Sequence, residues 1–146
     1  MVTQEALDGL DRRMVTKKDA ARRQIDVAIR LFYEKEYEST MTLAGAAEGQ
    51  IDGAAAAEVF LFSVLQQKQP AEFETASQWA THLNETRDWL KHPTPQLGDL
   101  RVMEEFEAWL MLVRAVSKYY AVFLQETDHM NRFVEWGRER GLVAKV

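Results

Sequence analysis

The chain contains no cysteine, so disulfide bonds and thiolate chemistry are excluded. It also lacks a glycine-rich phosphate loop, a Walker motif, a dinucleotide fingerprint and a nucleophile elbow. The most apolar run, residues 54–65, is broken by Glu58 and is too short to span a bilayer. Residues 1–18 lack the apolar stretch of a signal peptide. These absences predict a cytoplasmic protein with no membrane partner.

A positive charge excess is missing as well. The formal net charge is −5 and the sequence pI is about 5.3, so the molecule as a whole does not attract phosphate backbones. Nucleic-acid binding would therefore require a local basic patch. The 146 residues, 47% of them hydrophobic, are enough for one domain that buries roughly two-thirds of its unfolded surface.

Apolar residues recur at helical spacing in most of the chain, and no segment alternates with period two. Expected helices cover residues 18–37, 41–50, 72–91, 99–125 and about 128–141, with Ser39-Thr40, Asp99 and Thr127 as candidate N-caps. The segment 54–65 would continue the second helix after a kink. This pattern predicts an all-α, up-and-down bundle of about five helices, with residues 18–146 forming one domain. Residues 1–17 form a polar segment that is irregular or partly helical.

Two helices have features that predict how they pack. The run 43–47 consists mostly of alanine and glycine, which favours close approach of a neighbouring helix. The expected helix 99–125 carries two adjacent apolar stripes and should therefore lie at the centre of the bundle. The four tryptophans and Tyr119-Tyr120 fit core packing better than a base-stacking platform.

Chemically capable side chains concentrate at the end of the third expected helix, just before Pro93. On a helical wheel they span only about 140°, and the apolar residues of that helix occupy the opposite side. The residues are Asn84, Arg87, Asp88, Lys91 and His92. We expect all five to share one face opposite the packing face.

Arg87 and His92 together suit phosphodiester cleavage through the ribose 2′-hydroxyl. Histidine can remove and return a proton near neutral pH, and arginine presents a fixed charge and a planar fork to phosphate oxygens. Lys91 would add charge, while Asp88 and Asn84 would orient these groups. Such a reaction needs no metal or other cofactor.

The run Arg87-Asp88-Trp89-Leu90-Lys91-His92 resembles the Arg-polar-spacer-His signature of the HEPN superfamily. The chain is also similar to uncharacterised bacterial helical proteins that pair a "LAGAAE" helix, here residues 43–48, with an Asn…Lys-His motif. The resemblance implies a small all-α bundle and a homodimer in which two motifs face one cleft. It also implies that Arg87 and His92 are the functional residues of a metal-independent endoribonuclease or of an RNA- or nucleotide-binding domain.

Other interpretations stay open. Residues 84–92 would also make an ordinary solvated helix face, because cations near a helix C-terminus oppose its dipole. The chain would then be a non-enzymatic interaction or dimerisation protein with a protein partner. Glu126 and His129 have the Glu-x-x-His spacing of di-metal bundles, but no second such motif is present. The basic residues between Arg12 and Arg23 are expected to be solvated, and His82 is expected to be a packing residue.

Overall fold

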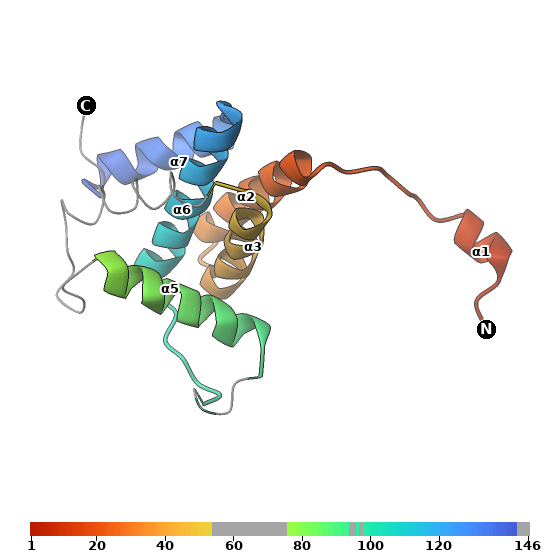
Figure 1. The fold of residues 1–146 in the computed structure, drawn as a ribbon, viewed down its shortest axis with the longest axis horizontal. Coiled ribbons are helices and arrows are strands. Elements are labelled where there is room, and N and C mark those ends of the chain that lie inside the picture. Colours follow the sequence, from red (N-terminus) through yellow and green to blue (C-terminus); the bar gives the residue numbers. More distant parts are fainter. Residues whose placement is uncertain (54–75, 94–95, 97, 143–146) are drawn as a thin grey trace.

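The computed structural model describes residues 1–53, 76–93, 96 and 98–142 (Figure 1). Regular structure in these ranges is entirely helical, which confirms the predicted all-α class. The helices are α1 (Gln4–Asp8), α2 (Lys17–Tyr33), α3 (Tyr37–Gln50), α5 (Ala76–Lys91), α6 (Glu105–Phe123) and α7 (Asp128–Glu139). The predicted continuation over residues 54–65 lies outside the described residues.

Helices α2 and α3 form a hairpin, with boundaries that differ from the sequence prediction. Helix α2 ends at Tyr33, and the turn places Lys35 at a positive φ of 64°. Helix α3 then begins at Tyr37, so Thr40 lies inside it and is not its N-cap. The Thr40 hydroxyl donates to the carbonyl of Glu36 at 2.8 Å and lies 3.4 Å from the Ala28 carbonyl of α2. A hydroxyl that bonds the preceding turn is compatible with a helix interior, which explains the earlier start.

Helix α6 begins at Glu105, so the prediction that Asp99 caps it is wrong. Glu104 is the N-cap, and its side chain and that of Glu107 form a reciprocal capping box. The residues before it run beside α5, where the Trp89 indole donates to the Gly98 carbonyl at 2.9 Å. The central position of α6 is confirmed, because every residue from 107 to 116 is buried and α6 packs against α2 and α3 (Figure 1).

The small residues of α3 produce the predicted close approach. A Cβ at Gly45 would lie 2.7 Å from Cδ of Arg87, so the stem of this α5 arginine rests directly on the α3 backbone. Helix α5 also meets α6 through large side chains. The Phe106 ring packs edge-on against Trp79 at 5.2 Å and stacks with Trp109 at 5.7 Å. Glycine thus brings α5 close to α3, and aromatic rings fill its junction with α6.

The ends of helices α5 and α7 follow ordinary helix-capping rules. Helix α5 stops at Lys91, two residues before Pro93, as predicted. The Thr127 hydroxyl caps α7, and Gly141, with φ of 67°, follows its end.

Helix α1 lies far from the other helices on an extended segment, and residues 1–17 are all exposed (Figure 1). In the described ranges, no helix combines the length and apolarity needed to cross a membrane.

Candidate functional site

The five residues predicted to share one face have different environments. Asp88, Lys91 and His92 are exposed at the end of α5, whereas Asn84 and Arg87 are half-buried and bonded to other helices. The wheel prediction fails for Asn84 and Arg87 because α3, with its glycine, packs against this side of α5. Arg87 pairs with Glu48 of α3, whereas His92 is exposed at the end of α5.

Arg87 instead belongs to a buried ionic cluster centred on Glu48, in the last turn of α3. Arg87 Nη1 lies 3.2 Å from Glu48 Oε2, and Arg114 Nε lies 3.3 Å from Oε1. Lys118 Nζ lies 3.2 Å from Oε1 and donates to the Glu48 main-chain carbonyl at 3.0 Å. Asn84 Oδ1 accepts a 2.8 Å hydrogen bond from Arg114 Nη1. We call these five residues, which come from three helices, the Glu48 cluster.

The Glu48 cluster is mostly buried and carries more positive than negative charge. The side chains of Glu48 and Lys118 are each 6% exposed and that of Arg114 is 10% exposed, whereas Arg87 reaches 22%. In the described part of the chain, three cations surround one carboxylate, which leaves a formal excess of two positive charges. The C-terminal end of α3, which Lys118 contacts, offsets about half a charge. Among the described residues, this acidic protein therefore contains a buried positive site whose most exposed member is Arg87.

Some donors in this cluster are unused. Nε of Arg87 and Nε of Arg114 are buried, and neither has a hydrogen-bond acceptor in the described part of the chain. Arg114 Nε is close enough to Glu48 for an ion pair, but not with hydrogen-bond geometry. Buried N–H groups are normally satisfied, so the Arg87 Nε leaves capacity for an additional acceptor.

The sequence prediction missed Glu48, Arg114 and Lys118. A signal was present for the last two, because they are the only charged residues between positions 108 and 119 of the central apolar helix. They are four residues apart and therefore project from the same face of α6. Glu48 ends the "LAGAAE" run, and Gly45 one turn earlier accommodates the Arg87 stem.

Gly45 offers a direct test of this packing. Replacing a helical glycine with alanine normally stabilises by about 1 kcal/mol. Gly45→Ala should lose that gain because the new methyl group displaces Arg87. Gly49→Ala should keep it, because no atom of the described residues lies within 4 Å of its Cβ position. Urea unfolding of both variants measures the difference. In an Arg87→Ala background, Gly45→Ala should become stabilising, and failure to do so would contradict the contact.

A second polar group lies at the α5–α6 junction. The buried Glu107 accepts a 3.1 Å hydrogen bond from Thr86, and its carboxylate contacts Nε2 of His82. Arg101 donates to Thr86 at 2.8 Å and to Glu85 at 3.1 Å. His82 also lies edge-on to Trp79 at 5.9 Å, in agreement with its predicted packing role. This group ties the segment before α6 to α5, and we assign it a structural role.

Neither of the other predicted chemical features is assembled into a site. Glu126 and His129 are both exposed, and the described residues include no group of three potential metal ligands. Arg12, Arg13 and Lys17 are exposed on the N-terminal segment, and Arg22 pairs with Asp19 at 3.6 Å. Their surroundings are those of solvated charges.

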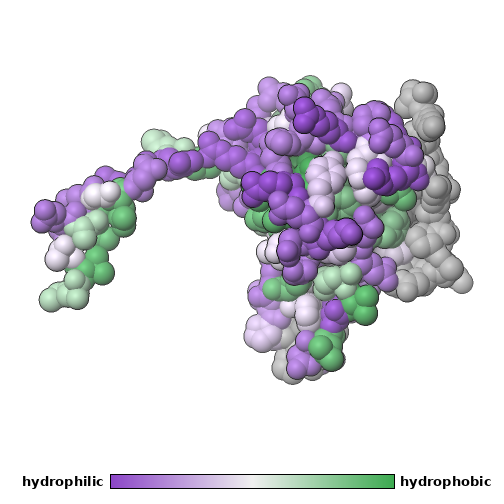
Figure 2. Space-filling model, turned by 180° about the vertical axis from the view of Figure 1, so that it is seen from behind, coloured by the Kyte–Doolittle hydropathy of each residue, from purple (hydrophilic) through white to green (hydrophobic). Residues whose placement is uncertain are grey.

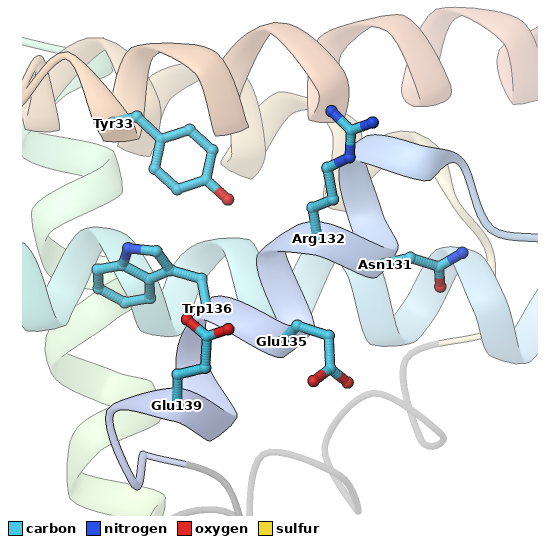
Figure 3. Close-up of a pocket in the computed structure, with 6 residues that line it drawn as sticks. All are labelled: Tyr33, Asn131, Arg132, Glu135, Trp136 and Glu139. Atoms are coloured by element: carbon cyan, nitrogen blue, oxygen red, sulfur yellow. The ribbon is translucent and has the colours of Figure 1, made fainter.

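A shallow hollow of about 350 Å³ lies between α2 and α7, lined by Tyr33, Asn131, Arg132, Glu135, Trp136 and Glu139. Figure 3 shows the Tyr33 hydroxyl directed into the gap between the two helices. Burial raises the pKa of Tyr33, and the charges of Arg140 and Arg132 oppose this shift. The Arg140 guanidinium lies 3.9 Å from the Trp136 ring centroid and Phe32 packs edge-on against that ring at 5.0 Å. These contacts argue against Trp136 as an open base-stacking platform.

The Glu48 cluster is thus the strongest candidate site in the described part of the chain. It combines buried cations from distant parts of the sequence, unused donors and one open edge. In comparisons with known proteins, the chain matches no family model, no curated protein and no solved structure.

Proposed function

We propose that this helical domain binds a phosphate-bearing ligand, a nucleotide or RNA, at the Glu48 cluster. The observation that carries the proposal is the convergence of Arg87, Arg114 and Lys118 on one carboxylate. Holding an uncompensated charge in a protein interior costs several kcal/mol, and one cation would be enough to neutralise Glu48. A bound anion would balance the remaining charge.

The types of donor present also favour phosphate. Arginine offers a rigid planar fork that matches phosphate oxygens, and lysine adds a compact charge. Arg87 contacts Glu48 through Nη1, and it is the most exposed of the three cations. A ligand would therefore meet Arg87 first and reach the two α6 cations behind it. The acidic surface elsewhere would restrict binding to this site.

The HEPN-like resemblance adds a catalytic version of this proposal. There, His92 would be the general acid/base and Arg87 would stabilise the phosphate, with Asn84 holding Arg114 and with Lys91 and Asp88 at the rim. His92 is exposed at the end of α5, and the resemblance implies that the two motifs of a homodimer face one cleft, where the two groups would meet. Cleavage therefore requires both the anion site and a second copy of the chain.

Calorimetric titration with AMP, and filter binding with mixed-sequence single-stranded RNA in EDTA, test the binding proposal. Arg87→Gln should weaken binding by about 10- to 100-fold, the usual range for a charge-assisted hydrogen bond. Arg30→Gln, at an exposed α2 position, should bind like the wild type. No binding by the wild type, or equal binding by Arg87→Gln, would refute the proposal.

Cleavage needs a separate experiment with the same RNA. The catalytic version predicts cyclic phosphate ends from the wild type and no products from His92→Ala, with an almost unchanged melting temperature because His92 is exposed. Binding without cleavage by the wild type would leave a non-catalytic phosphate-binding domain.

A second candidate function, protein interaction or self-association, is favoured by the N-terminal segment. Leu7, Leu10, Met14 and Val15 are exposed there, and the space-filling view shows apolar side chains along the projecting arm (Figure 2). Exposed apolar residues gathered on one segment suit a partner surface. Removing residues 1–15 should then shift the mass measured by light scattering to that of a monomer. An unchanged mass would contradict self-association through this arm.

A further inference from the structure

The charge of the Glu48 cluster points to one class of phosphate. We infer that the Glu48 cluster binds a terminal phosphate monoester, at the end of an RNA strand or on a mononucleotide, in preference to a phosphodiester within a strand. This inference rests on the proposed phosphate-binding function. A monoester carries about −1.5 to −2 charges near neutral pH, whereas a diester carries one. The formal excess of two positive charges matches the monoester.

The number of cationic donors also favours a phosphate monoester. Three cationic side chains surround the site, and a terminal phosphate presents three oxygens that are free of ester bonds, whereas a diester presents two. A monoester can therefore give each cation its own oxygen. With a diester, one buried cation would be left facing an ester oxygen, which is a poor acceptor.

The burial pattern adds a steric reason. Arg114 and Lys118 are at least nine-tenths buried, and Arg87 forms the open edge at 22% exposure. A diester carries chain on two sides and needs a groove with two exits. A terminal phosphate can enter from one side and leave its single substituent outside. The buried Nε of Arg87, which has no hydrogen-bond acceptor among the described residues, would be a donor available to the entering oxygens.

Glu48 then acts as an internal counter-anion in the empty state. Its carboxylate holds the three cations together while no ligand is bound. Arg87 is the cation best placed to turn toward a ligand, because it is the most exposed and its contact with Gly45 involves only the stem. Lys118 stays anchored to the Glu48 carbonyl at the end of α3.

Three matched ligands test this inference: AMP, its 5′-methyl phosphodiester and adenosine. They share the base and ribose and differ in phosphate charge and in the number of free oxygens. Calorimetry at neutral pH should give at least about tenfold tighter binding of AMP than of the methyl diester, and still weaker binding of adenosine. Equal affinities for AMP and the diester would overturn the inference and leave the proposed function standing. Binding of none of the three, together with no RNA binding, would refute the proposed function itself.

Two variants link this preference to the buried cations. Lys118→Met keeps the length of the side chain and removes its charge, so it should reduce the preference for AMP over the diester to about threefold or less. Arg30→Gln should retain the wild-type ratio. A soluble, folded Lys118→Met protein with an unchanged ratio would overturn the assignment. If that variant does not fold, Arg87→Gln, which removes the cation at the exposed edge, serves instead with the same expected loss of preference.

Discussion

Replacing Glu48 with glutamine is expected to lower the free energy of unfolding by about 3–5 kcal/mol. Glu48 is the carboxylate that Arg87, Arg114 and Lys118 share, and its side chain is only 6% exposed. Glutamine has nearly the same shape but no charge, so three cations would repel each other in a poorly hydrated interior. Removing one partner from a buried ionic group is costly mainly because of the charges left behind.

The matched control is Glu85→Gln. Glu85 also pairs with an arginine, Arg101, at 3.1 Å, but it is about half exposed. Exposed ion pairs contribute about 1 kcal/mol or less, so the control should unfold close to the wild-type urea midpoint. Equal losses of stability in the two variants would show that Glu48 does not balance a buried cationic cluster.

Anions should partly restore the Glu48→Gln protein. Without its carboxylate the site would carry three positive charges, and a bound phosphate would take the place of Glu48. A ligand that binds only the folded state raises its stability by mass action. Phosphate also stabilises proteins generally because it is excluded from their surfaces. The rise in melting temperature that added phosphate gives Glu48→Gln must therefore exceed the rise that it gives Glu85→Gln. Equal gains would argue against anion binding at the cluster.

The second large effect is expected from Trp109→Ala, which should cost about 3–5 kcal/mol of unfolding free energy. Trp109 is fully buried in the central helix and stacks with Phe106, which in turn contacts Trp79 of α5. Its removal would leave a cavity where α5 joins α6. Because α5 supplies Arg87 and Asn84, the loss should also weaken phosphate binding.

Tyr120→Ala is the control on the same helix. Tyr120 is half exposed near the C-terminal end of α6, and its loss should cost about 1 kcal/mol or less. Urea unfolding, monitored by circular dichroism, compares the unfolding free energies of the two variants. A small loss for Trp109→Ala would mean that the α5–α6 junction does not depend on this aromatic stack.

Apolar spacing was enough to predict the all-α class, the presence of helices α2, α3, α5, α6 and α7, and the central position of α6. Apolar spacing is a local property, and it places one side of each helix against the core wherever a partner exists. The run of small residues around Gly45 also revealed a close crossing. The predicted starts of α3 and α6 were wrong for two reasons. The Thr40 hydroxyl bonds the Glu36 carbonyl inside α3 and does not cap the helix, and Glu104 caps α6 in place of Asp99. The sequence alone does not show which of these polar residues makes the capping contact.

The meeting point of the buried charges depends on the packing of helices that are distant in the sequence. Glu48 is 39 residues from Arg87 and 70 from Lys118, and no local pattern links them. The wheel assigned Arg87 to a solvated face because it treated α5 as packing on one side only. In the bundle, α5 packs against both α3 and α6, and this brings Arg87 to Glu48 and leaves His92 outside. Long-range packing thus brought two residues of the predicted surface motif, Asn84 and Arg87, into a largely buried ionic cluster.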